Sequence, residues 1–146
     1  GYNHDFYPLD ISSTCIPLIG DIKDNNYTEE EIKMINETKK ILHLNNVDIS
    51  STCVRVPIFY GHAVSIYLEF DQEIEIDVII EELKKYDYIY LNNIANTIDV
   101  YNTDKVSVGR IRKGINNKSM WLYCTADNLR IGASSNALKI LKKMIS

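Results

Sequence analysis

The run from Val64 to Phe70 constrains the fold most strongly, because apolar and polar residues alternate along it without a break. Every second residue, beginning with Val64, is a large apolar one, and the residues between them are Ser, Tyr and Glu. A period of two is typical of a strand that buries one face and exposes the other. The sequence therefore predicts a half-buried strand at this position.

The other expected elements do not follow a regular alternation of strand and helix. A capping box formed by Thr28 and Glu31 predicts a helix that runs to about Leu42. Further helices are expected over 76–86 and from about Ser134. Further strands are expected near 11–18 and over 50–58, 88–91, 106–112 and 120–125. A long polar connection is expected over 92–105. This order favours an α+β fold over a doubly wound sheet. No Gly-rich loop follows a strand, so no nucleotide site is visible.

Composition excludes several classes of protein. The 146 residues fit one domain, and the net charge of −4 argues against a sequence-independent nucleic-acid binder, which would carry a basic stripe. No apolar run approaches the roughly 20 residues of a membrane span. Cys15, Cys53 and Cys124 are odd in number and widely spaced, so we expect neither a disulfide framework nor a metal site. The stretch GYNHDFYPLD lacks the basic and apolar regions of a signal peptide, so we expect a reducing cytoplasm as the compartment.

Four residues stand out as candidates for chemistry. His62 follows Gly61 between two predicted strands, where a loop can present a side chain to a cleft. Arg55 is one of only four arginines, and its planar guanidinium can grip a carboxylate through two parallel bonds. Glu30 and Lys33 share one helix stripe. The residues alone leave simpler explanations open: a structural loop histidine, a strand-surface arginine paired with an acid, and an ordinary helix ion pair.

Four stretches of the chain carry a family resemblance. In order they read TEEEIKMINETKKIL, STCVRVPIFYGHAVSIYLEF, VGRIRK and ADNLRIGASSNALKI. Together they resemble the later part of aspartate-β-semialdehyde dehydrogenase. The resemblance implies an irregular lead-in over 1–15 and a substrate-binding and dimerisation domain over 16–146. It also implies a mixed, largely antiparallel sheet packed against helices, like the C-terminal domain of glyceraldehyde-3-phosphate-dehydrogenase-type enzymes.

The same resemblance implies a reaction and a set of roles. The reaction is the reduction of aspartyl β-phosphate by NADPH to aspartate semialdehyde and phosphate, in the biosynthesis of lysine, threonine and methionine. The matching positions are His62 as general acid and base, Arg55 as the clamp on the substrate α-carboxylate, Glu30 facing the substrate amino group, Lys33 helping to hold phosphate, and Asn128 near the nicotinamide end of NADP.

The family's NADP domain and nucleophilic cysteine precede the matched region, so we expect the segment alone to be inactive. We expect it to act on small molecules as part of a homodimer, with no nucleic acid, membrane or metal involved. Glu30, Lys33, Arg55 and His62 should converge on one cleft. Two alternatives stay open: a domain like that of N-acetyl-γ-glutamyl-phosphate reductase, and a stand-alone, non-catalytic dimerisation or binding module.

Overall fold

The computed structural model describes Tyr7 and residues 9–145, and the chain divides into two compact units, residues 1–58 and residues 59–146. Residues 1–6 and 8 of the predicted lead-in lie outside the described residues. The first unit contains one helix, and the second contains the sheet and the remaining helices of the described residues.

The first unit contains helix α1 (Glu29–Leu42), as the capping box predicts. The Thr28 side chain accepts a hydrogen bond from the Glu31 backbone N–H, and the Glu31 carboxylate accepts one from the Thr28 backbone N–H. Three glutamates occupy the first turn and two lysines the last, which suits the helix dipole at both ends. The helix ends at His43, whose left-handed backbone (φ 54°) directs the chain away from the helix axis.

The predicted strand over 50–58 is wrong, because this segment is extended but joins no sheet. One isolated antiparallel bridge links Arg55 to Ile16, which is also the only trace of the strand expected near 11–18 in the described part of the unit. A second bridge links Ile22 to Thr28. An apolar, β-branched run adopts an extended backbone readily, but a ladder also needs a neighbour that offers a full row of partners.

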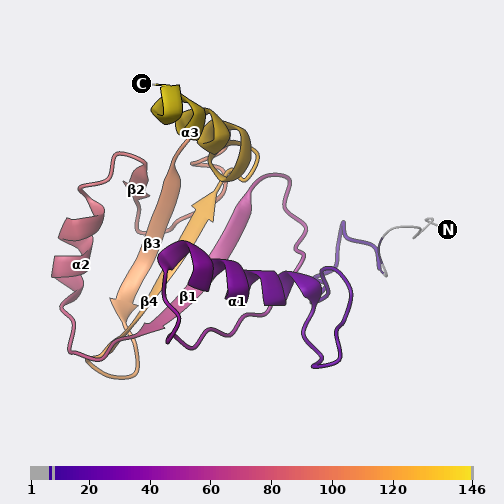
Figure 1. Cartoon of the computed structure of the whole chain (residues 1–146), viewed down its shortest axis with the longest axis horizontal. Helices are drawn as coiled ribbons and strands as arrows, with labels where there is room; N and C mark the ends of the chain where they lie inside the picture. The colour runs from indigo at the N-terminus through magenta and orange to yellow at the C-terminus, as the bar shows by residue number, and fades with distance from the viewer. Residues whose placement is uncertain (1–6, 8, 146) are drawn as a thin grey trace. The chain divides into compact units, whose positions relative to one another are not determined.

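The second unit is organised around a four-stranded sheet in the order β1-β4-β3-β2 (Figure 1). Strands β1 (His62–Glu69) and β3 (Val106–Lys113) both pair antiparallel with β4 (Ser119–Ala126). The short strand β2 (Ile89–Leu91) pairs with β3 in parallel. The strand predicted from Val64 is confirmed as β1, as is a mixed and largely antiparallel sheet, but the predicted buried face is not, because Val64 and Leu68 are exposed.

Two helices complete the second unit. Helix α2 (Ile76–Leu83) lies between β1 and β2 in the chain, and α3 (Ser135–Ile145) ends the described part. One turn of π-helix, η1 (Arg130–Ser134), leads into α3 and was not expected from the sequence. The α+β fold class is confirmed.

The predicted polar connection over 92–105 is ordered by side-chain bonds. Asp99 accepts hydrogen bonds at 2.7 Å from the amide groups of Asn92 and Asn96. The Thr125 hydroxyl of β4 donates to the Asn96 backbone oxygen at 2.8 Å. The connection also supplies Val100, which is buried to 1% exposure beside the sheet core. Asn and Asp side chains here replace the backbone ladder that a strand would provide.

Among the described residues, no helix is long and apolar enough to cross a membrane. Nor does the described part of the chain hold a group of three or more His, Cys, Asp or Glu residues placed to bind a metal ion.

Candidate functional site

The first turns of α1 present two charged side chains to solvent. The Glu30 carboxylate and the Lys33 ammonium form an ion pair at 3.6 Å, and their side chains are 43% and 52% exposed. A pair this exposed is worth little to stability, since solvent screens it. Both charges therefore remain accessible to a ligand that carries an ammonium and an anionic group.

Glu31, the next residue along the helix, is buried at 7% exposure and uses both carboxylate oxygens. Oε2 accepts from the Thr28 backbone N–H at 2.8 Å, and Oε1 accepts from the Cys53 backbone N–H at 2.9 Å. These two backbone bonds lower the pKa of Glu31. The Ser51 hydroxyl adds a bond to the Glu31 backbone oxygen at 3.1 Å. The extended segment 51–53 is thus tied to the first turn of α1.

Arg55 lies two residues beyond Cys53 in the same unit. Its backbone N–H and C=O both bond to Ile16, at 2.8 and 2.9 Å, so its main chain is fixed. Its guanidinium lies over the ring of Tyr7, 4.9 Å from the centroid, a cation–π contact. No carboxylate among the described residues forms an ion pair with it. The structural alternative of an arginine paired with an acidic neighbour therefore finds no support in the described residues.

His62 is the first residue of β1 and is paired in register with Ala126, the last residue of β4. The preceding Gly61 adopts φ +80°, a conformation that L side chains rarely take. A Cβ on Gly61 would lie only 2.7 Å from the Ala126 backbone oxygen. The chain thus reaches the strand through a tight turn that a glycine permits, and the exposed His62 side chain lies at the end of the sheet.

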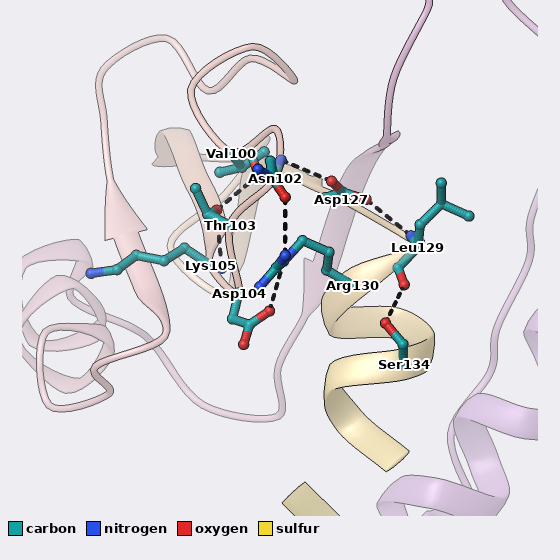
Figure 2. A network of polar contacts seen from close by, with 9 residues as sticks. All are labelled: Val100, Asn102, Thr103, Asp104, Lys105, Asp127, Leu129, Arg130 and Ser134. Carbon is teal, nitrogen blue, oxygen red and sulfur yellow. Dashed lines mark hydrogen bonds and ion pairs between the residues drawn. The ribbon is translucent and has the colours of Figure 1, made fainter. Parts of the chain in front are cut away.

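Asn128 follows two residues after Ala126, so it belongs to the same end of the β1–β4 pair as His62. Its neighbour Asp127 is 6% exposed, and its carboxylate bonds both to the turn that follows β4 and to the connection over 92–105 (Figure 2). The Asp127 carboxylate accepts from the backbone N–H of Leu129 at 3.0 Å and from that of Asn102 at 2.9 Å. Within the described chain the Asn128 side chain makes no hydrogen bond, so its amide is available to a ligand.

Arg130 closes the same network from η1 (Figure 2). Its Nε donates to Asp104 Oδ1 at 3.2 Å, and its Nη1 donates to Asn102 Oδ1 at 3.0 Å. A hydrogen bond from the Ser135 side chain is the largest cause of the lowered pKa of Asp104, followed by the bond and charge of Arg130. The connection over 92–105 and the turn that carries Asn128 are therefore held as one structure.

Cys53 and Cys124 are poorly suited to act as nucleophiles. Burial raises the pKa of the Cys53 thiol, and the charges of Glu31 and Glu30 raise it further. Burial also raises the pKa of Cys124. Because the thiolate is the reactive form, both are held in the unreactive state at neutral pH.

The structure brings the sequence candidates together in two groups. Glu30 and Lys33 form one contact pair, and Arg55 belongs to the same unit through its anchored segment. His62 and Asn128 share one end of the β1–β4 pair. Convergence of the first group with His62 on one cleft stays a prediction.

Sequence reasoning missed two buried carboxylates, Glu31 and Asp127. The capping box gave a local role to Glu31, but nothing in the sequence signalled its second bond, to a residue 22 positions away. For Asp127, a signal was available: an Asp followed by Asn at the end of a predicted strand is typical of a side chain that caps its own turn.

Known proteins match this chain closely. A family model described as "Semialdehyde dehydrogenase, dimerisation domain" matches residues 2–131. An aspartate-semialdehyde dehydrogenase of Campylobacter jejuni is 38% identical over 95% of this chain, which spans 42% of that relative's length. The crystal structure of aspartate semialdehyde dehydrogenase II from Vibrio cholerae superposes with a TM-score of 0.90 at 36% identity, covering 95% of this chain and 43% of that one.

A further crystal structure, described as that enzyme complexed with ASA, superposes with a TM-score of 0.85 at 37% identity, over 90% of this chain and 41% of its own. The chain thus spans about two fifths of the length of these relatives. The family model, in contrast, matches almost the whole of this chain, residues 2–131. On that match, this chain belongs to the semialdehyde dehydrogenase dimerisation-domain family.

Proposed function

We propose that this chain is the substrate-binding and dimerisation part of an aspartate-semialdehyde dehydrogenase. The enzyme would reduce L-aspartyl 4-phosphate with NADPH to aspartate semialdehyde and phosphate, in the cytoplasm, for the biosynthesis of aspartate-family amino acids. Family membership and relatives that bear this enzyme's name support the proposal. A solved relative that is described as complexed with ASA supports it further.

One observation carries the proposal furthest: a single unit holds Arg55 on a fixed backbone, without an acidic partner among the described residues, beside a helix whose first turns expose Glu30 and Lys33. The proposed substrate has a carboxylate, an ammonium and a phosphate. A guanidinium binds the first in a bidentate manner, a carboxylate the second, and a lysine the third. The three charges on this unit are complementary to those of the substrate.

The second unit would supply the proton and the contact with the cofactor. His62 is exposed at the start of β1 and can exchange a proton with the reacting thiol and with the oxygen of the product. The unbonded amide of Asn128 is suited to contact the carboxamide of a nicotinamide ring. NADPH would supply the hydride. The nucleophilic thiol would come from outside this segment, as the family resemblance implies, and the raised pKa values of Cys53 and Cys124 agree with that.

We propose a homodimer as the working form, in keeping with the family description. The alternative of a stand-alone binding module predicts no turnover in any context. The alternative of an N-acetyl-γ-glutamyl-phosphate reductase-like domain predicts turnover of the N-acetylated, longer substrate instead.

The test is phosphate-dependent reduction of NADP with aspartate semialdehyde, measured on the full-length protein that carries this segment. We expect turnover with aspartate semialdehyde and not with N-acetylglutamate semialdehyde, and no turnover by residues 1–146 alone. Absence of activity in the full-length protein, or a preference for the N-acetylated substrate, would overturn the proposed function. Turnover by the isolated segment would show that it carries its own nucleophile.

A further inference from the structure

Glu31 has more bonds than a helix cap requires. A capping box needs one carboxylate oxygen, which here accepts from the Thr28 N–H. The other oxygen accepts from Cys53, in a segment that belongs to no sheet. The side chain is also turned inward, unlike those of its neighbours Glu29 and Glu30, so it does not reach solvent or a ligand.

The bond to Cys53 matters because Cys53 is close to Arg55 in the chain. Arg55 comes two residues later, and its own backbone is held by Ile16 on both its N–H and its C=O. Glu31 and Ile16 therefore fix this short stretch at two points. Without the bond to Glu31, the stretch would keep one bridge and the weaker bond from Ser51.

We propose that Glu31 is a positioning residue for Arg55. Its carboxylate holds the backbone at Cys53 against the first turn of α1, which sets where the guanidinium stands relative to the charged side chains of that turn. The inference rests on the proposed function, because it assumes that Arg55 binds the substrate carboxylate. It assigns to Glu31 no contact with the substrate.

A carboxylate is required for this role because the two partners are both N–H donors. Replacement by glutamine preserves the shape of the side chain but leaves a single acceptor oxygen. The NH₂ group of the glutamine would then face the backbone N–H of Thr28 or of Cys53. Two donors would meet there, and no hydrogen bond could form between them. Glu31→Gln therefore loosens either the helix cap or the Cys53 segment without creating a cavity.

The experiment is a double-mutant cycle in the full-length enzyme. The variants are Glu31→Gln, Arg55→Ala and the double variant, with Glu37→Gln as the matched control on the exposed face of the same helix. We expect Glu31→Gln to raise KM for aspartate semialdehyde about tenfold, the size of a coupling between neighbouring groups. The values of kcat and of KM for NADP should stay close to the wild type, and Glu37→Gln should change nothing.

In the Arg55→Ala background, Glu31→Gln should no longer change KM for the semialdehyde. An equal rise in both backgrounds would overturn the inference, since Glu31 would then act independently of Arg55. So would a Glu31→Gln enzyme with unchanged KM. If Arg55→Ala itself leaves KM unchanged, the failure lies with the proposed role of Arg55, which is a distinguishable result.

Ser51→Ala provides a second test in case Glu31→Gln does not fold. It removes only the hydroxyl that bonds to the Glu31 backbone oxygen at 3.1 Å, from a half-buried position. We expect a rise in KM of about two- to tenfold that is absent in the Arg55→Ala background. No change in KM, or the same change without Arg55, would again overturn the inference.

Discussion

Replacement of Gly61 by alanine tests whether the turn before β1 positions His62. Gly61 adopts φ +80°, where an L residue costs about 1–2 kcal/mol relative to glycine. The new Cβ would also stand 2.7 Å from the Ala126 backbone oxygen, whereas ordinary contact begins at 3.4 Å. The two strands must therefore separate by about 0.7 Å at this point, because neither atom belongs to a side chain that can rotate away.

That separation falls on the terminal pair of the β1–β4 ladder, His62 with Ala126. A weakened ladder bond costs about 0.5–1.5 kcal/mol, so the total destabilisation is about 1.5–3.5 kcal/mol. The melting temperature of the full-length protein should fall, by about 2–4 °C for each kcal/mol in a domain of 150–250 residues. A displacement of His62 should also lower kcat, by up to about a hundredfold if it approaches 1 Å.

Gly132→Ala is the matched control for stability. Its backbone has no positive φ, and a Cβ there would meet only the Cβ of Asn128, at 4.0 Å. We expect it to melt with the wild type or slightly above it, because alanine restricts the unfolded chain. A Gly61→Ala protein that melts with Gly132→Ala and keeps full kcat would refute the reasoning.

Three further outcomes are expected from the structure. Arg55→Lys should raise KM for aspartate semialdehyde about ten- to a hundredfold in steady-state kinetics, because a point charge replaces a bidentate one. His62→Ala should lower kcat with a smaller effect on that KM, measured in the same assay, since its proposed work is proton transfer. The pKa of Glu31 is lower in the folded than in the unfolded state, so its carboxylate stabilises the fold at pH values above the ordinary pKa of glutamate. This stabilisation is lost as the pH falls through the pKa of the folded state. Denaturation followed across acid pH should therefore show a shallower loss in Glu31→Gln than in the wild type.

The elements that the sequence predicted correctly are those whose signals are local. The capping box of Thr28 and Glu31 marks the start of α1, and the helix was expected to run to about Leu42, where it ends. The alternation that begins at Val64 marks β1, because side chains on a strand point to opposite faces in turn whichever strand pairs with it, although the apolar face is not buried in the described chain. In both cases the information lies within a few residues of the element.

The strand predicted incorrectly over 50–58 shows what local sequence signals cannot decide. Its sequence is as β-prone as that of β1, but the N–H of Cys53 bonds to a carboxylate rather than to a neighbouring strand. Arg55 bonds to the backbone of Ile16, and the other backbone–backbone bond described for the segment is local, from the Ile58 N–H to the Val56 oxygen. Pairing is decided by what the rest of the chain places alongside, and the composition of the segment carries no record of it.

The same limit applies to the turn after β4. Its π-helix begins at Arg130, whose guanidinium bonds to Asp104 and Asn102, residues 26 and 28 positions earlier. The sequence indicated a polar connection there but gave no sign that it would fold back onto the turn. A π-turn is often a mark of function, and this one begins two residues after Asn128.

The described contacts separate two kinds of polar residue in this chain. Glu31 and Asp127 are buried, and each of their carboxylates accepts two backbone bonds, so both are engaged in holding the chain. Arg55, His62 and Asn128 show the opposite pattern. Their backbones are held by a bridge, a ladder and a capped turn, whereas no side-chain hydrogen bond or ion pair is made by any of them within the described chain. A fixed backbone with an unengaged polar side chain is what preorganised binding requires, because the cost of ordering is met on folding rather than on binding. This pattern, rather than residue type alone, separates Arg55, His62 and Asn128 from Glu31 and Asp127. The Arg55 guanidinium lies over the Tyr7 ring, and Glu30 and Lys33 pair with each other but stay exposed.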